Sequence, residues 1–241
     1  MPIDPLHRAK SYPYAIPNRS FVYRNGDPHY LEPGSATLNL DGRTPVLAVG
    51  SNQSPEQLAR KFEGGAWGEI PVLRIVLHDY DSVYSPHIAT YGAVAATLQE
   101  APGVRVSLFV TWLTDDQLIH MHTTEVSSAN YGFGQLCNLR VDVDMGPPLE
   151  ALFIYNSTRG TLCSEGTPVP LSEVPAAGRT WAAMSQIEIQ HHVQERLAPD
   201  SALDTFIYES INDPVLRRRR SDMLKVGARP FAPANFNEIS I

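Results

Sequence analysis

The sequence predicts an α+β fold in which a small, mostly antiparallel and curled β-sheet or β-barrel is flanked by helices. Between residues 45 and 156, short runs rich in β-branched and aromatic residues follow one another at close spacing. Only two helices are expected to interrupt these runs, whereas a doubly wound parallel sheet would alternate strands with helices. The first 43 residues carry little periodicity, and the residues from about 180 to 225 carry a helical one.

Composition and charge narrow the class of protein. The chain has 241 residues, of which 43% are hydrophobic, which suits one globular domain with a sizeable core. Its net charge of −7 argues against general binding of nucleic acids or anionic membranes, which requires broad basic surface. No apolar run approaches the roughly 18 residues of a membrane-spanning helix, and the N-terminus has no apolar signal-peptide core. Cys137 and Cys163 lack the spacing of a disulfide framework or a metal site. We therefore expect a cytoplasmic protein that binds neither nucleic acid nor membrane.

Three segments are expected along the chain. Residues 1–43, rich in Pro, Tyr, Asn and Gly, are interpreted as an irregular arm packed over the domain. Residues 44–156 are expected to form the barrel, and residues 157–241 a loop followed by a helical extension packed on it. Turn residues such as Ser85-Pro86 and Pro102-Gly103 separate several of the expected strands. These strands are 45–50, 72–85, 89–98, 104–113, 135–144 and 150–156.

The first strand is followed by a polar loop and a helix. Ser54 is expected to cap this helix, Pro55 occupies its first turn, and Gln57 would complete a capping box. Gly50-Ser51-Asn52 must then connect the strand to the helix. Gly50 permits a positive φ or a close approach of backbone, and successive N–H groups in such a turn can form an anion-binding concavity. A plain capped turn is the alternative that the pattern leaves open.

A second helix is expected from Thr114, which forms a capping box with Gln117. Its apolar stripe consists of Leu118, Met121 and His122. Glu125 is the next position of this stripe, so a carboxylate is expected on the inward face of the last helical turn. Burial and the negative end of the helix dipole would both raise the pKa of this carboxyl toward neutrality, which suits a general acid/base. A frayed helix end that exposes Glu125 to water is the alternative. No metal site is expected, because no third ligand accompanies His122 and Glu125 at a recognisable spacing.

The helical extension contains a basic run from Arg217 to Arg220. We interpret this run as a solvated helix face that pairs with acidic groups such as Asp213 and Asp222, with an anionic partner as the alternative. Asp200 and Ser201 are the expected N-cap positions of the second helix of the extension.

The two loop-to-helix junctions, in this order, resemble the gamma-glutamylcyclotransferase-like family over about residues 45 to 155. That family begins with a strand that ends in a Tyr-Gly-Ser-Asn loop before a helix, here matched by Val49-Gly50-Ser51-Asn52 and SPEQL. Small-residue strands follow, here YGAVAATLQEAPGVRVSLFVTWL, and then the helical segment LTDDQLIHMHTTEVSSANY. Glu125 falls on the catalytic glutamate of the family, and Tyr131 on a tyrosine that often follows it. Val49 departs from the pattern, because it replaces the usual tyrosine.

The resemblance implies a small β-barrel with the site at its mouth and an enzyme that needs no cofactor or metal. Such an enzyme releases 5-oxoproline and a free amine or amino acid from a small-molecule γ-glutamyl substrate, as a lyase or acyltransferase. Glu125 would be the general acid/base, and the substrate-binding residues would be Val49, Gly50, Ser51, Asn52 and Tyr131. A homodimer is compatible with this reading. The alternative is a non-catalytic binding or interaction module that keeps the same pocket.

Overall fold

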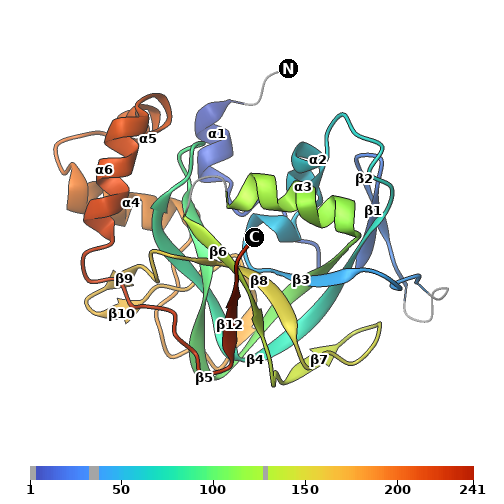
Figure 1. Ribbon diagram of the computed structural model, residues 1–241. Helices are drawn as coiled ribbons and strands as arrows, with labels where there is room; N and C mark the ends of the chain where they lie inside the picture. The colour runs from blue at the N-terminus through green and yellow to red at the C-terminus, as the bar shows by residue number, and fades with distance from the viewer. Residues whose placement is uncertain (1–3, 33–37, 127–129) are drawn as a thin grey trace.

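The computed structural model of the chain describes residues 4–32, 38–126 and 130–241. Residues 33–37 of the predicted arm and residues 127–129 after the second predicted helix therefore lie outside the described residues. The helices lie in the upper part of the view in Figure 1, and most strands of one large sheet lie below them. No helix within the described ranges is both long enough and apolar enough to cross a membrane.

The sheet has ten strands, eight of which follow the order β12-β6-β8-β3-β5-β4-β1-β2, while β7 pairs with β4 and β11 with β5. The pair of β3 and β8 is parallel, and the other pairs between described strands are antiparallel. The strands of this sheet are β1 (Phe21–Arg24), β2 (Asp27–Tyr30), β3 (Thr44–Ala48), β4 (Ile70–Ile88), β5 (Val94–Leu113), β6 (Tyr131–Leu136), β7 (Val141–Val143), β8 (Leu152–Ser157), β11 (Ala176–Ala177) and β12 (Phe236–Ile239). The short strands β9 (Cys163–Ser164) and β10 (Thr167–Pro168) form a separate pair. The predicted α+β class and the mostly antiparallel sheet are therefore confirmed.

The predicted closed barrel is wrong. Among the described residues, no pairing joins the end strands β12 and β2, so the sheet stays open. Segments outside the predicted barrel occupy the strand edges: β1 pairs with β4, and β12 pairs with β6. The sheet thus includes strands from both sides of residues 44–156. The boundaries expected for the barrel segment are therefore not the boundaries of the sheet.

Two predicted turns are irregularities within long strands. β4 has 19 residues and includes Ser85-Pro86, while β5 has 20 residues and includes Pro102-Gly103. Gly103 has a φ of +84°, and its N–H donates to the Asp79 carboxylate at 2.8 Å. The β4–β5 ladder shifts register next to Asp79 and then continues. The expected strands 89–98 and 104–113 are therefore parts of one bent strand, which begins at Val94.

The N-terminal arm is more regular than the sequence predicts. It begins with helix α1 (Pro5–Lys10), which Asp4 caps by accepting a hydrogen bond from the N–H of Leu6. It continues through Tyr12, which is buried, to the hairpin β1–β2, which extends the sheet. The prediction of an irregular arm is wrong, because each strand of this hairpin has only four residues, too few to show a period.

The helices that follow are the 3₁₀ turn η1 (Ser51–Gln53) and the α-helices α2 (Pro55–Lys61), α3 (Asp115–Glu125), α4 (Gln186–Leu197), α5 (Leu203–Asn212) and α6 (Pro214–Leu224). The capping box of Thr114 and Gln117 is confirmed on α3. The capping box predicted at Ser54 does not form, because the Ser54 hydroxyl is buried and has no hydrogen-bond partner among the described residues. Ala202, not Asp200 or Ser201, occupies the N-cap of α5.

Two buried apolar clusters pack on opposite faces of β5. Leu108 and Val110 belong to the larger cluster, which includes side chains of α1, α4, α5 and α6. Phe109 belongs to the second cluster, together with Leu58 of α2 and Met121 of α3. Successive residues of a strand point to opposite faces, so β5 holds the two groups of helices in place on either side of the sheet.

A buried ion pair ties β4 to the segment that precedes α4. The Asp81 side chain is fully buried and accepts hydrogen bonds from Arg179 Nε at 2.7 Å and Arg179 Nη2 at 2.8 Å. Burial raises the pKa of Asp81, and the guanidinium opposes that rise only in part. The same Arg179 group also donates to the Val174 carbonyl at 2.9 Å.

We expect Arg179→Ala to lower the free energy of unfolding by about 3–5 kcal/mol, because it leaves a buried carboxylate without its partner. Urea denaturation at neutral pH measures the change. Arg24→Ala is the matched control, since its pair with Glu69 is about half exposed and such surface pairs contribute roughly 0–1 kcal/mol. Equal small losses in the two variants would show that Asp81 does not depend on Arg179 for its burial.

Candidate functional site

The polar loop after β3 and the end of α3 face one cavity with a volume of about 660 Å³. The residues predicted from the sequence to bind substrate or to catalyse all line this cavity: Val49, Gly50, Ser51, Asn52, Glu125 and Tyr131. The structure thus brings together two junctions that lie roughly 70 residues apart in the sequence.

Close packing, not a positive φ, requires glycine at position 50. Gly50 has a φ of −123°, outside the left-handed region. A Cβ atom at this position would lie 2.2 Å from Tyr12 Oη and 2.9 Å from Ala96 Cβ. The chain then turns through η1, where the N–H groups of Ser51 and Asn52 have no acceptor among the described residues. These two groups can therefore donate to an oxygen atom of a ligand.

A tyrosine ring does lie beside the loop, but the N-terminal arm supplies it. Tyr12 Oη accepts a hydrogen bond from the N–H of Ala96 at 2.9 Å, and Tyr131 Oη donates to the carbonyl of Ala96 at 2.8 Å. Two tyrosines from distant parts of the chain thus hold both sides of one residue of β5. Tyr12 was not among the residues predicted for the site, because no local pattern in the arm indicates which surface it covers.

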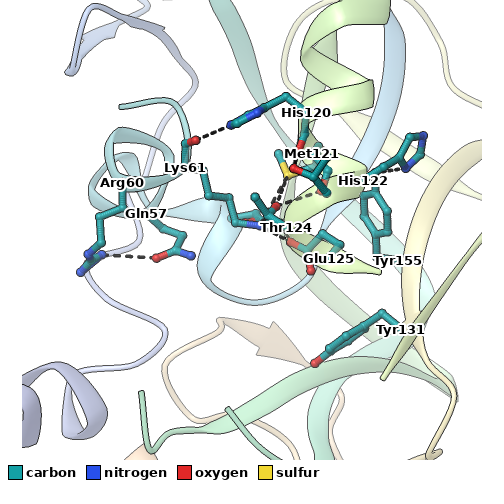
Figure 2. Close-up of polar contacts among 12 residues, drawn as sticks. Gln57, Arg60, Lys61, His120, Met121, His122, Thr124, Glu125, Tyr131 and Tyr155 are labelled. Carbon is teal, nitrogen blue, oxygen red and sulfur yellow. Dashed lines mark hydrogen bonds and ion pairs between the residues drawn. The ribbon is translucent and has the colours of Figure 1, made fainter. Parts of the chain in front are cut away.

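Glu125 lies inward at the end of α3, as the apolar stripe of the helix predicts. Its carboxylate accepts a hydrogen bond from Asn52 Nδ2 at 2.8 Å and forms an ion pair with Lys61 of α2. Figure 2 shows Lys61 reaching from α2 toward both Glu125 and Thr124, with Tyr131 on the far side of the carboxylate. The Glu125 side chain is 16% exposed, so the predicted alternative of a frayed, solvated end is wrong.

The prediction that Glu125 has a raised pKa is wrong. Burial does raise the pKa of this carboxyl, but the Lys61 charge and the hydrogen bonds from Lys61 and Asn52 together lower it below its ordinary value. Glu125 is therefore ionised at neutral pH. Lys61 was not among the residues predicted for the site, because it is 64 residues earlier and its orientation follows from the packing of α2 against α3.

A neutral histidine also lines the cavity. Burial lowers the pKa of His87 to about 4, and the nearby charges of Arg159 and Arg217 contribute to this decrease. Its Nδ1 atom is buried and has no hydrogen-bond partner within the described part of the chain. His87 therefore offers an uncharged imidazole at neutral pH. It lies at the end of a strand whose pattern carries no sign of a site.

His122, by contrast, serves the packing of α3. Its Nδ1 atom lies 2.7 Å from the hydroxyl of Tyr155, and its ring packs edge-on against Phe133. Across the residues that the structure describes, no three His, Cys, Asp or Glu side chains are grouped so that they could hold a metal ion.

Both flanking segments contribute walls to the cavity. Tyr12 comes from the arm, and Pro214, Arg217, Arg218 and Ser221 come from α6. The volume of about 660 Å³ remains open between these walls, within the range of pockets that hold drug-sized ligands. The arm and the helical extension therefore shape the pocket without filling it.

Two solved structures are similar to this chain at low sequence identity. A protein described as gamma-glutamyl cyclotransferase matches over 80% of this chain and 91% of its own, with 14% sequence identity and a TM-score of 0.39. YkqA from Bacillus subtilis matches over 80% of this chain with 14% identity and a TM-score of 0.37, and this chain spans 57% of its length. No family model matches the chain, and no curated protein matches it. The structural match is to the kind of protein that the sequence resembles, but scores this low carry no conclusion about function.

We expect Lys61→Met to raise the pKa of Glu125, because burial would then act without the opposing charge. Carbon-13 NMR of the Glu125 carboxyl through a pH titration measures it. In the natural chain the lowered pKa contributes stability that is present above the unfolded-state pKa and lost as the pH falls through the folded-state pKa. In the variant the contribution of Glu125 to stability changes sign, because its folded-state pKa is then raised. Ionisation of Glu125 therefore lowers the stability of the variant as the pH rises.

Lys10→Met is the matched control, because this lysine of α1 pairs with Asp204 instead. The Glu125 pKa should not change in the control. An unchanged pKa in Lys61→Met would show that the ion pair does not govern the ionisation of Glu125.

Proposed function

We propose that this chain is a gamma-glutamylcyclotransferase-like enzyme that releases 5-oxoproline and a free amine or amino acid from a γ-glutamyl compound. One observation carries the proposal: the loop residue Asn52 donates directly to Glu125 at 2.8 Å, at the wall of a single cavity. An oxygen-binding turn and an ionised carboxylate then flank the same space. An intramolecular reaction needs little more than such a site, because the nucleophile and the carbonyl belong to one substrate.

The reaction uses the two halves of the site in different roles. The N–H groups of Ser51 and Asn52, which have no acceptor among the described residues, hold a carboxylate or carbonyl oxygen of the substrate. Glu125 takes a proton from the substrate's α-amino group, whose nitrogen forms a bond to the γ-carbonyl carbon and closes a five-membered lactam. The bond from that carbon to the leaving nitrogen breaks, and Glu125 returns the proton to the leaving amine. No water, oxidant or reductant is consumed.

Lys61 gives the site a way to activate the nucleophile. A substrate amine within hydrogen-bond reach of Glu125 also lies close to the Lys61 ammonium, because the two side chains form an ion pair. A neighbouring positive charge disfavours the charged form of an amine and so lowers its pKa. The fraction of free amine, which is the nucleophile, rises accordingly. Lys61 therefore acts on the substrate's charge state while it keeps Glu125 ionised and ready to accept the proton.

The same ion pair also favours the second candidate function, a binding module without chemistry. A buried carboxylate that is paired and hydrogen-bonded can serve structure alone, and the pKa of Glu125 is lowered, not tuned toward neutrality. The cavity would then bind a small anionic ligand through the loop and its cationic side chains. The two functions differ in one observable, which is the release of 5-oxoproline.

We expect the purified protein to release 5-oxoproline from at least one member of a panel of γ-glutamyl amines, amino acids and peptides. Glu125→Gln should reduce the rate about 10²–10⁴-fold, because it removes the proton acceptor while it keeps the size of the side chain. Mass spectrometry of the products measures the rate and separates 5-oxoproline from glutamate, which a hydrolase that activates water through Glu125 would release instead.

Asp116→Asn is the matched control, since it removes an exposed carboxylate from the same helix. Circular dichroism of each variant checks that the fold survives. Activity that persists in Glu125→Gln would contradict the role of Glu125. Absence of turnover across the whole panel would contradict the enzyme and favour the binding module.

A further inference from the structure

The cavity that holds Glu125 carries more positive charge than its acidic groups balance. Its lining includes four cationic side chains, which are Lys61, Arg159, Arg217 and Arg218. Among the described residues, Glu125 is the one acidic side chain of this lining. The chain as a whole has a net charge of −7, so this concentration of positive charge is local.

Two of the four cations have acidic partners. Lys61 pairs with Glu125, and Arg159 Nη1 lies 2.8 Å from Asp222 Oδ1. Arg159 Nε also donates to Asn130 Oδ1 at 2.7 Å, which orients its guanidinium at the cavity wall. The predicted pairing of the basic run with Asp222 is therefore wrong, since Asp222 accepts from Arg159.

The other two cations, Arg217 and Arg218, have no acidic partner in the described part of the chain. Arg217 Nη1 donates to the carbonyls of Ser210 at 2.8 Å and Ile211 at 3.1 Å, in the last turn of α5. Arg218 is exposed. Asp213, which was the other predicted partner, instead caps α6 by accepting from the N–H groups of Val215 and Leu216. Two positive charges thus face the cavity without a compensating carboxylate.

Arg217 and Arg218 come from a different element of the cavity wall than the loop does. The loop and Glu125 belong to η1 and α3, whereas Arg217 and Arg218 belong to α6, and α1 lies between α3 and α6 in Figure 1. A cavity of about 660 Å³ has room for more than a glutamyl group, since pockets of this size hold drug-sized ligands. If the glutamyl part of a substrate binds at the loop, its leaving part extends toward the arginines.

On the basis of the proposed function, we propose that Arg217 and Arg218 bind acidic groups of the leaving amine. The substrates are then γ-glutamyl compounds whose leaving amine carries two acidic groups, as a dicarboxylic amino acid does. Two positive charges without partners match two carboxylates, and guanidinium planes bind carboxylates through paired hydrogen bonds. Neutral leaving amines would forgo these contacts.

Two ligands that cannot react test this specificity by titration calorimetry. N-glutaryl-glutamate and N-glutaryl-glutaminamide lack the α-amine that would attack the carbonyl, and they differ in the charge of the part that mimics the leaving amine. We expect the natural chain to bind N-glutaryl-glutamate about tenfold more tightly or better, with a preference that falls as salt is added. Arg218→Glu should reduce the preference about tenfold or more, because it places a carboxylate against carboxylates.

Arg219→Glu is the matched control, because Arg219 is the next residue of α6, is exposed and does not line the cavity. The Arg219→Glu variant should keep the preference for N-glutaryl-glutamate. Arg218 is the residue of choice because Arg217 also holds the end of α5, so its loss would disturb the helix packing.

Equal binding of the two ligands by the natural chain would overturn the proposal. An equal loss for both ligands in Arg218→Glu would also overturn it, because Arg218 would then hold the glutaryl carboxylate and not the leaving part. The ligands do not turn over, so a preference for the acidic ligand stands even if no γ-glutamyl compound yields 5-oxoproline. Failure of the specificity and failure of the enzyme are therefore distinguishable.

Discussion

The geometry of the site depends on the contacts that the carboxylate of Glu125 makes with Lys61 and Asn52. This carboxylate joins three elements, because it ends α3, pairs with Lys61 of α2 and accepts from Asn52 of the loop. An ionised group in a largely buried position costs several kcal/mol unless it is paired and hydrogen-bonded, so the three elements are held in one arrangement. The position of the loop's N–H groups relative to the carboxylate follows from this constraint.

A second constraint fixes another part of the cavity wall, beside the same loop. Tyr12 and Tyr131 bind the N–H and the carbonyl of Ala96, and the ring of Tyr12 leaves no room for a side chain at Gly50. The arm is therefore part of the site and not an appendage to it. A ring at position 49 is not required for an aromatic wall beside the loop, since Tyr12 provides one from a different part of the chain.

Local sequence patterns predicted those parts of the site that depend on residues close together in the sequence. The capping box at Thr114 and the inward position of Glu125 follow from residues within one helix, and both are present. The charge state of Glu125 was predicted wrongly, because it depends on Lys61, which only the packing of α2 against α3 brings near. The open sheet was missed for the same reason, since strands at both ends of the chain occupy the edges that a barrel would close.

The pair of the fully buried Asp81 with Arg179 shows the same limit, because the partners are 98 residues apart in the sequence. A run of arginines can be interpreted as a solvated helix face, but the sequence does not show which of them face a cavity. In the structure Arg220 pairs with Glu209, Arg217 holds the end of α5, and Arg218 lines the cavity. Four adjacent residues of one type thus have different environments, which the helix phase and its neighbours determine.

The positive field of the cavity links the proposed chemistry to the proposed specificity. The Lys61 charge keeps Glu125 ionised, and the same charge disfavours protonation of a substrate amine. The low pKa of His87 reflects the positive charge of the cavity in part, because Arg159 and Arg217 contribute to it. A field that attracts an acidic leaving group therefore also increases the fraction of free amine that can attack. Recognition of the leaving group by the arginines and activation of the nucleophile by Lys61 would then both depend on positive charge in one cavity. A substrate with a neutral leaving amine would lose the first effect while it kept the second.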